Sequence, residues 1–339
     1  MGSRIDCGDL AVPLFVFPWE GSCHPAAEQA ERDTVAWGAQ YGLYPDEKYR
    51  QRVVRTRYGY LAARCYPRAD RALLQVTADY CLWFFLADDL FVDRVDTVTP
   101  DTIAQLTAMI DVLDLDRVGE RPIYGAAAWL DICRRLRMLL SPEHFQRFAT
   151  GMRLWASTAG LQILNHVQPH PIRIGAYETI RRHTSGMNPC LALSDAANAG
   201  AVSAAEYYAP ATQRLQLHAN NVVSWSNDIQ SLVVEARQPG QFRNMVTLYT
   251  ADGTDLSRAV DTVADRVRAE IDHFAVLAER VRRSARTELC GYITGLQDWM
   301  RGYQDWYLLD TQRYGRAATE ADDRAVAPGQ RHERDRADH

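Results

Sequence analysis

The sequence predicts an all-α protein, and three observations support this prediction. Apolar residues recur at three- and four-residue spacing over long segments, which is the pattern of helices with one buried face. Alternating runs of β-branched residues bounded by tight turns, which would indicate hairpins, are nearly absent. Prolines and glycines fall between the helical segments. With 339 residues, 47% of them hydrophobic, the chain is long enough to bury a large core.

Twelve helices are expected, and residues that begin or break a helix delimit most of them. Pro142 and Pro210 suit the first turn of a helix, while the Pro169-His170-Pro171 corner ends the helix before it. The helix over residues 69–87 is the most apolar. The expected segments are residues 26–41, 46–64, 69–87, 101–114, 124–139, 142–166, 174–185, 189–199, 210–236, 241–251, 255–284 and 287–312.

The chain is expected to form one domain followed by a tail. No Gly/Ser-rich linker divides residues 1–315, so a single helical domain is the simplest organisation. Residues 316–339 contain six acidic residues and five arginines, and Val326 is their only large aliphatic residue. Such a segment lacks the apolar surface that would offset its ordering entropy. We therefore expect residues 316–339 to be disordered.

Composition excludes several kinds of partner. The 38 basic residues against 43 acidic residues leave a net charge of −5, which offers no broad positive field for nucleic acid. Seven scattered cysteines without a CxxC pair indicate reduced thiols. The longest apolar stretch, residues 80–87, is far shorter than the roughly 20 residues of a membrane span. We expect a cytoplasmic protein with no nucleic-acid partner and no stable membrane insertion.

Three carboxylates stand at the end of the most apolar helix: Asp88, Asp89 and Asp93. On a helix Asp89 and Asp93 lie about 40° apart, so at least two of the three can face one cavity. Negative charge is disfavoured at a helix C-terminus, a conflict that a bound cation would relieve. Taken alone, however, the cluster is explained as simply by an exposed acidic helix end paired with arginines.

A second polar cluster is more specific. Asn227, Ser231 and Glu235 recur at intervals of four residues and span an arc of about 80° on one helix. Helical side chains lean toward the N-terminus, so the long Glu235 side chain reaches back toward the other two. Amide, hydroxyl and carboxylate oxygens are all ligands that Mg²⁺ accepts. A solvent-facing polar stripe is the alternative, but the many apolar neighbours leave little of this helix for water, so a metal site is favoured.

Together the two clusters resemble the metal-binding motifs of class I terpene synthases, in particular of small single-domain bacterial enzymes similar to selinadiene and pentalenene synthases. Residues 88–93, DDLFVD, resemble the family's aspartate-rich motif in its DDxxx(D/E) form. Residues 227–235, NDIQSLVVE, match the ND(L/I/V)xSxxxE motif at every defined position. One departure is Val234, because relatives often carry a lysine before the motif's glutamate. The resemblance runs from about Phe84 to Tyr314.

Two further elements of the resemblance concern the diphosphate group. Arg181 stands 46 residues before Asn227, at the spacing of the family's diphosphate-sensing arginine, and Arg182 beside it is a rival for that role. Arg313 and Tyr314 resemble the pair that closes over the diphosphate. The resemblance implies that these side chains donate hydrogen bonds to the diphosphate, and that Asp89 pairs with Arg181.

The resemblance also implies the fold, the cofactor and the reaction. It implies antiparallel helices around a central cavity, and three Mg²⁺ ions, with Mn²⁺ as a substitute, held by the aspartate-rich motif and by the second cluster. Asp88 is the principal ligand on its side; Asp89 and Asp93 are further candidates. The implied reaction is the ionisation and cyclisation of an isoprenyl diphosphate. Dimerisation is an expectation that only the resemblance supports.

The carbocation of such a reaction needs a dry pocket with aromatic walls. Phe84 and Phe85 precede the aspartates by one turn, which places their rings over the metal site. Opposite them we expect Trp299, Trp306 and Tyr307, although ordinary core packing explains any one of these aromatics equally well. By resemblance to the family's effector position, the backbone carbonyl of Ser185, in a helix break, points into the cavity.

The substrate and the reaction class retain alternatives. We expect farnesyl diphosphate as substrate, with geranylgeranyl diphosphate next. A chain-elongating isoprenyl diphosphate synthase shares this chemistry but needs a second aspartate-rich motif, where this chain has Asn227, Ser231 and Glu235. A helical scaffold with surface acidic clusters is the non-enzyme alternative, and it predicts no metal-dependent diphosphate binding.

Overall fold

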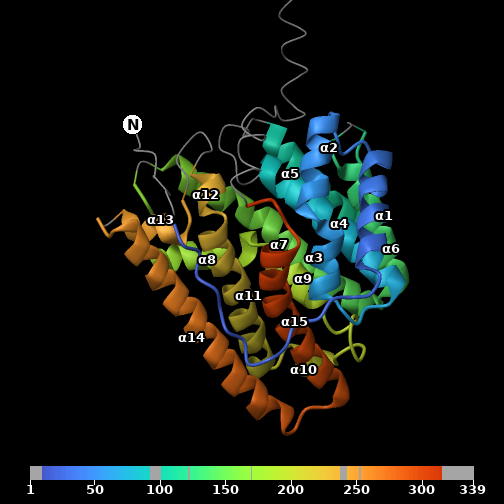
Figure 1. Ribbon diagram of the computed structural model, residues 1–339. Coiled ribbons are helices and arrows are strands. Elements are labelled where there is room, and N and C mark those ends of the chain that lie inside the picture. Colours follow the sequence, from blue (N-terminus) through green and yellow to red (C-terminus); the bar gives the residue numbers. More distant parts are fainter. Residues whose placement is uncertain are drawn as a thin grey trace, which may run out of the picture.

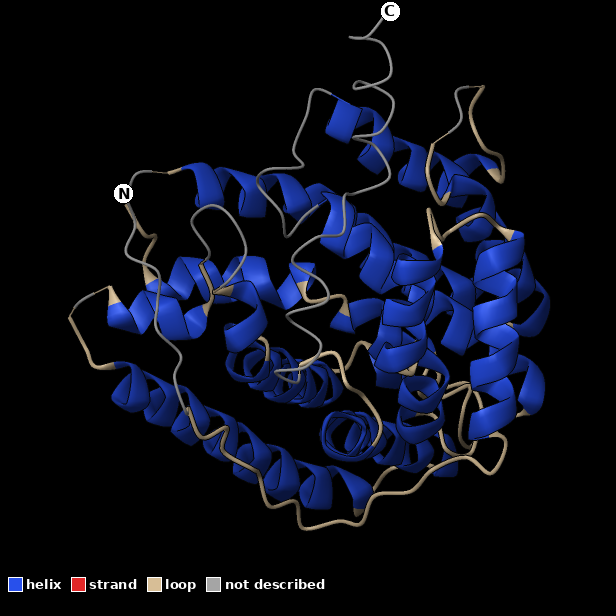
Figure 2. Cartoon of the chain, turned by 45° about the horizontal axis from the view of Figure 1, so that its top comes forward, coloured by secondary structure: helices blue, strands red, loops and turns tan. Residues whose placement is uncertain are grey.

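The structure is a computed structural model that describes residues 10–91, 101–120, 123–168, 170–236, 243–251 and 253–314. These residues form helices and no strand, which confirms the predicted all-α fold (Figures 1 and 2). The expected disordered tail, residues 316–339, lies outside the described residues. The helices are α1 (Ala27–Gln40), α2 (Glu47–Thr56), α3 (Tyr58–Cys65), α4 (Arg71–Phe91), α5 (Asp101–Leu115), α6 (Ala126–Leu139), α7 (Pro142–Val167), α8 (Ile174–Thr184), α9 (Met187–Ala192), α10 (Ala204–Tyr207), α11 (Pro210–Gln230), α12 (Leu232–Glu235), α13 (Met245–Thr250), α14 (Leu256–Arg282) and α15 (Thr287–Leu309).

The helices pack around a central space. α15 packs on α3, α3 packs on α4, and α11 packs on α8, α9 and α15. α1 covers α3 and α4 from outside, and the long α14 runs diagonally along α11 (Figure 1). The inner helices therefore present one face to the outer helices and the other to a common interior.

Most expected helices are present, but local breaks were missed. Arg57 adopts a left-handed conformation, with φ 62° and ψ 56°, and splits the expected helix 46–64 into α2 and α3. Nothing in the local sequence indicates this break, because left-handed backbone is usually taken by glycine or asparagine. The expected helix 210–236 is interrupted at Ser231, and the short α10 was not expected.

An extended segment near the N-terminus crosses α15 (Figure 1, blue). The side chain of Gln304 on α15 bonds both backbone groups of Phe15: its Nε2 donates to the carbonyl at 2.9 Å, and its Oε1 accepts from the N–H at 2.8 Å. The Trp19 indole donates to the carbonyl of Gln297 at 3.0 Å. The Gln304 side chain thus supplies the donor and the acceptor that a neighbouring strand would otherwise supply. Both backbone groups of Phe15 are hydrogen-bonded, although this segment is not helical.

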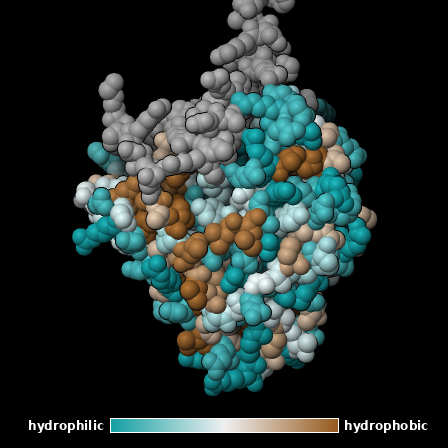
Figure 3. Space-filling model, viewed as in Figure 1, coloured by the Kyte–Doolittle hydropathy of each residue, from teal (hydrophilic) through white to brown (hydrophobic). Residues whose placement is uncertain are grey.

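The core is rich in aromatic residues. Trp83 stacks on Trp129 with ring centroids 4.3 Å apart, and its indole donates to the carbonyl of Gly125 at 2.9 Å. On the face shown in Figure 3, apolar residues form separate patches within a mostly hydrophilic surface. No helix in the described part of the chain is long and apolar enough to cross a membrane.

Candidate active site

A pocket opens between the inner helices, and it brings together residues that lie far apart in the sequence. Its walls come from α4, the α8–α9 junction, α11, α12, α15 and the segment after α15. Eleven residues that the sequence predicted for a site line this one pocket: Phe84, Phe85, Asp88, Asp89, Arg181, Ser185, Asn227, Ser231, Glu235, Arg313 and Tyr314. Polar groups gather at one end of it and aromatic groups at the other.

The aspartate-rich motif contributes two carboxylates to the polar end. Asp88 and Asp89 lie at the end of α4, and the Trp155 indole donates to Asp88 Oδ1 at 3.1 Å. Arg313 and Arg52 donate to the two oxygens of Asp89, at 2.7 Å and 3.0 Å. Asp93, the third predicted ligand, lies outside the described residues.

The second cluster faces these carboxylates from the end of α11 and from α12. Ser231 interrupts the helix, and its N–H and its hydroxyl both donate to the carbonyl of Asn227, at 2.8 Å and 2.7 Å. The hydroxyl proton is thereby committed to the backbone, so the oxygen keeps its lone pairs for another partner. Glu235 Oε2 accepts from the Asn244 amide at 3.3 Å.

The donor set fits a hard divalent cation. The carboxylates of Asp88 and Glu235, the amide oxygen of Asn227 and the hydroxyl of Ser231 line the same end of the pocket, and every one of these donors is an oxygen. Mg²⁺ takes such ligands together with phosphate oxygens and water, whereas Zn²⁺ favours nitrogen and sulfur. The residues present therefore suit a magnesium ion better than a transition metal.

Arg181 is held at the pocket wall by a buried carboxylate. Its Nε lies 2.9 Å from Asp228 Oδ1, and its Nη2 donates to Asn227 Oδ1 at 2.7 Å. Asp228 also accepts from the Tyr177 hydroxyl at 2.7 Å and from the Met245 N–H at 3.2 Å. Burial raises the pKa of Asp228, against the lowering effects of Arg181 and the Tyr177 hydroxyl. The family resemblance predicts Asp89 as the partner of Arg181, but among the described residues the ion pair of Arg181 is with Asp228, and Asp89 pairs with Arg313 and Arg52.

The neighbouring arginine, Arg182, is not among the residues that line the pocket. Its carbonyl accepts from the side chain of Asn220 at 2.9 Å, which ties the end of α8 to α11. Successive residues of a helix point about 100° apart, and of these two arginines it is Arg181 that lines the pocket. The sequence left both arginines as candidates for the diphosphate-sensing residue, and their positions favour Arg181.

The segment after α15 closes the polar end. Arg313 is held against Asp89, and its guanidinium lies 5.0 Å from the centre of the Phe85 ring. The Tyr314 hydroxyl accepts from Asn227 Nδ2 at 3.2 Å. Burial raises the pKa of Tyr314, so the hydroxyl keeps its proton and can donate it. Arg52 of α2 also lines the pocket; sequence reasoning missed it because no motif distinguishes one arginine in an arginine-rich chain.

The break between α8 and α9 fits closely against an aromatic ring. Gly186 has φ 71°, and a Cβ atom built on it would lie 2.2 Å from the Phe84 ring. Ser185 ends α8 and lines the pocket, and its hydroxyl accepts from the Met187 N–H at 3.3 Å. Glycine is required here both for its backbone conformation and for the space that the ring occupies.

Aromatic and aliphatic side chains form the other end. The Phe84 ring packs against Tyr80 and Trp155, with centroids 5.8 Å and 5.2 Å away. Of the aromatics expected on the opposite wall, Trp299 lines the pocket, whereas Trp306 and Tyr307 do not. Trp306 is fully buried, and its indole donates to the carbonyl of Thr56 at 3.0 Å, so it is a core residue. Further apolar lining residues are Leu61, Cys81, Met187, Cys190 and Val223, and Tyr303 joins the two ends because its hydroxyl accepts from Asn227 Nδ2 at 2.9 Å.

Comparison with known proteins identifies relatives that match nearly the whole chain. A (+)-corvol ether B/(+)-corvol ether A synthase of Kitasatospora setae, described as (2E,6E)-farnesyl diphosphate cyclizing, is 59% identical and covers 93% of this chain and 99% of its own. A sesquiterpene synthase of Metarhizium brunneum is 57% identical and covers 95% of this chain and 94% of its own.

Solved structures and a family model agree with these relatives. The SVS_A2 protein from ancestral sequence reconstruction superposes with a TM-score of 0.79 at 27% identity, covering 91% of this chain and 93% of its own. Linalool/nerolidol synthase from Streptomyces clavuligerus, at 21% identity and a TM-score of 0.75, covers 87% of this chain and 100% of its own, and shares the fold. The model of terpene synthase family 2, C-terminal metal binding, matches residues 79–273. The chain therefore belongs to the terpene synthase family and is a class I terpene synthase.

Proposed function

We propose that the protein cyclises (2E,6E)-farnesyl diphosphate to a sesquiterpene in a reaction that depends on Mg²⁺. The observation that carries this proposal is a single pocket with two chemically different ends, one of carboxylates, amide and arginines and one of aromatic rings. Farnesyl diphosphate has the same division, because a charged head is joined to an apolar C15 chain. A relative 59% identical to this chain is described as cyclising this substrate.

At the polar end we assign the diphosphate to the arginines and to bound metal. Asp88, Asn227, Ser231 and Glu235 would hold three Mg²⁺ ions, with Mn²⁺ as a substitute, and Asp93 is a further candidate ligand. When bound, these ions would neutralise the negative charge of the departing diphosphate. Arg181, Arg313 and Tyr314 would donate hydrogen bonds to the phosphate oxygens, because a guanidinium fork suits them. Asp89 would orient Arg313 and Arg52 rather than bind metal.

Ionisation breaks the allylic carbon–oxygen bond, and the electron pair leaves with the diphosphate. The cation then remains at the aromatic end, where a face of Phe84 or Phe85 would stabilise it by about 0.5–2 kcal/mol. We assign the backbone carbonyl of Ser185 to the same region, where the partial negative charge of its oxygen would further stabilise the cation. Exclusion of water from this end would allow a ring to close before the cation is quenched or loses a proton.

The proposal is tested by incubating the protein separately with C10, C15 and C20 isoprenyl diphosphates, with Mg²⁺ or with a chelator, and by analysing extracts by gas chromatography and mass spectrometry. A cyclic C15 product that requires Mg²⁺ is expected. Arg181→Ala should abolish this product, and the adjacent Arg182→Ala is the matched control that should retain most of it. A cyclic product from the C20 substrate alone would change the substrate assignment.

Two other outcomes would replace the proposal. Consumption of isopentenyl diphosphate with formation of a longer diphosphate would identify a chain-elongating enzyme. No product and no Mg²⁺-dependent binding of inorganic diphosphate would leave a non-catalytic helical protein. We place the reaction in the cytoplasm, a proposal supported by the free thiols of the described cysteines.

A further inference from the structure

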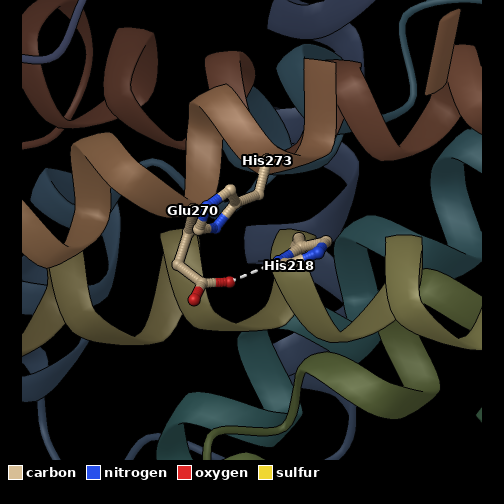
Figure 4. Close-up of side chains that lie close together, drawn as sticks. All are labelled: His218, Glu270 and His273. Atoms are coloured by element: carbon tan, nitrogen blue, oxygen red, sulfur yellow. Dashed lines mark hydrogen bonds and ion pairs between the residues drawn. The ribbon is translucent and has the colours of Figure 1, made fainter. Parts of the chain in front are cut away.

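A second group of ligating side chains lies where α11 packs on α14, apart from the pocket. His218 of α11 faces Glu270 and His273 of α14, and the potential ligand atoms of the three lie within 4.8 Å of one another (Figure 4). None of the three lines the pocket. His218 precedes Asn227 by nine residues, which is about 13 Å along the axis of α11. The group is therefore separate from the candidate magnesium ligands.

Two long helices hold this group in place. Glu270 and His273 are three residues apart on α14, so their side chains lie on the same face of that helix. The His218 and Glu270 side chains are only 13% and 17% exposed, and His218 Nδ1 lies 2.6 Å from Glu270 Oε2. The geometry of these two ligands is thus set by the packing of α11 on α14.

The third side chain, His273, is exposed. Its ring centroid lies 5.7 Å from that of His218, with an angle of 46° between the ring planes. Within the described ranges, no hydrogen bond to the His273 ring is present. A ring nitrogen of His273, at the solvent edge of the group, already lies within 4.8 Å of the other two potential ligand atoms.

We propose that His218, Glu270 and His273 bind one divalent transition-metal ion, with Zn²⁺ the best fit, and that this ion bridges α11 and α14. Two imidazole nitrogens and one carboxylate oxygen are a donor set that Zn²⁺ takes when water fills the fourth position. His273 is exposed, so solvent water reaches this side of the group. Mg²⁺ prefers oxygen ligands, so this site and the pocket select different metals.

The competing explanation is an interhelical hydrogen bond from His218 to Glu270 with an unrelated histidine beside it. The two explanations differ in what they predict for zinc. A metal bridge between α11 and α14 exists only in the folded protein, so zinc would raise the melting temperature in proportion to the logarithm of its free concentration. A simple hydrogen bond predicts no such dependence.

The test uses the full chain without a histidine tag, stripped of metal with a chelator. Isothermal titration with ZnCl₂ is expected to show one bound equivalent, and calorimetry is expected to show a zinc-dependent rise in melting temperature that the His273→Gln variant does not show. His273→Gln should weaken zinc binding at least tenfold, and Glu270→Gln should do the same. His273 is the primary variant because an exposed side chain can be replaced without loss of folding.

Two matched controls locate the binding. His170→Gln removes another exposed histidine and should leave zinc binding unchanged. Glu235→Gln removes a candidate magnesium ligand and should also leave it unchanged, which separates this site from the pocket. Equal zinc affinity in the His273→Gln variant and the parent, or a stoichiometric response to Mg²⁺ that this variant loses, would overturn the proposal. As a spectroscopic check, Co²⁺ should give visible absorption bands in the parent and not in His273→Gln.

Discussion

The carboxylate of Asp89 lies 2.7 Å from the guanidinium of Arg313, and this ion pair joins the end of α4 to the segment after α15. Arg52 of α2 pairs with the same carboxylate at 3.0 Å. Burial lowers the pKa of Arg313, but Asp89 and the nearby tyrosines outweigh that effect and raise it well above its usual value. Two charged arginines are thus held at the polar end of the pocket by one carboxylate.

This arrangement assigns different tasks to adjacent aspartates. Asp88→Asn removes a proposed metal ligand, so the Mg²⁺ concentration needed for half-maximal activity should rise at least tenfold. Asp89→Asn leaves that requirement within about threefold but releases Arg313 and Arg52, so it should raise KM for the diphosphate substrate. Activity measured over a matrix of Mg²⁺ and substrate concentrations separates the two effects. A larger Mg²⁺ requirement in Asp89→Asn than in Asp88→Asn would reverse the assignment.

The buried carboxylate of Asp228 is expected to be important for stability as well as for positioning Arg181. Asp228→Asn leaves the partly buried Arg181 without its counter-charge, which should lower the free energy of unfolding by about 3 kcal/mol. Tyr177→Phe removes one hydrogen bond to Asp228 and should cost about 1–2 kcal/mol. Urea unfolding of the two variants measures both values. A smaller loss in Asp228→Asn than in Tyr177→Phe would contradict the role of the ion pair.

Asn244 is expected to position Glu235. Its amide donates to the carbonyl of Asp228 at 2.7 Å and to Glu235 Oε2 at 3.3 Å, while its Oδ1 caps α13 by accepting from the Thr247 N–H at 3.0 Å. Asn244→Asp preserves the cap but replaces the donor with a second carboxylate beside Glu235. We expect a several-fold change in the Mg²⁺ requirement with little loss of helix stability. Asn244→Ser, which also keeps a cap, is the uncharged control.

The contact between Gly186 and Phe84 predicts a large effect of one methyl group. Gly186→Ala places a side chain where φ is positive, at a cost of about 1–2 kcal/mol, and forces the Phe84 ring to move. The melting temperature should fall and the product mixture should change, because Phe84 lines the pocket. Gly160→Ala, in an open position on α7, is the matched control and should stabilise the protein by about 0.5–1 kcal/mol. An unchanged product mixture in Gly186→Ala would show that the ring does not contact the substrate.

Glu31 gives the fold a dependence on pH. Burial raises its pKa to about 7, against the N–H of Gly59, which donates to Glu31 Oε2 at 2.7 Å. Because the folded protein binds this proton more tightly than the unfolded chain, the free energy of unfolding should fall as the pH rises from about 4.5 to about 7. The fall amounts to at most about 3 kcal/mol. In Glu31→Gln this part of the pH dependence should disappear, as denaturant unfolding at several pH values would reveal; an identical pH profile would exclude the effect.

Periodicity and helix-breaking residues were sufficient to predict the all-α class and most of the helices, because burial of one face imposes a pattern on the sequence. They could not predict the break at Arg57, since tertiary contacts and not local sequence hold that residue in a left-handed conformation. The same holds for Trp306, which was expected in the pocket but lies in the core.

The candidate site, like the fold, could be predicted from the sequence only in part. Oxygen-bearing side chains at helical spacing predicted that Asn227, Ser231 and Glu235 share one site, and all three line the pocket. The partner of Arg181 could not be found in this way. Asp228 lies next to Asn227 in the sequence, and only the packing of α8 on α11 decides which of the acidic residues meets the arginine. No motif or spacing in the sequence distinguishes Arg52 from the other arginines.

Residues 304–313 bond to residues in the first third of the chain. Arg313 pairs with a residue 224 positions earlier, Asp310 with Arg64 at a separation of 246, and Gln304 holds the backbone of a residue 289 positions away. Contacts of such range make folding slow and cooperative, because long loops must close before these contacts form. A chain still on the ribosome has the helices that carry the proposed metal ligands but lacks Arg313 and Tyr314, which line the same pocket. The pocket is therefore completed only when synthesis of this region has ended, so partial chains are not expected to ionise substrate.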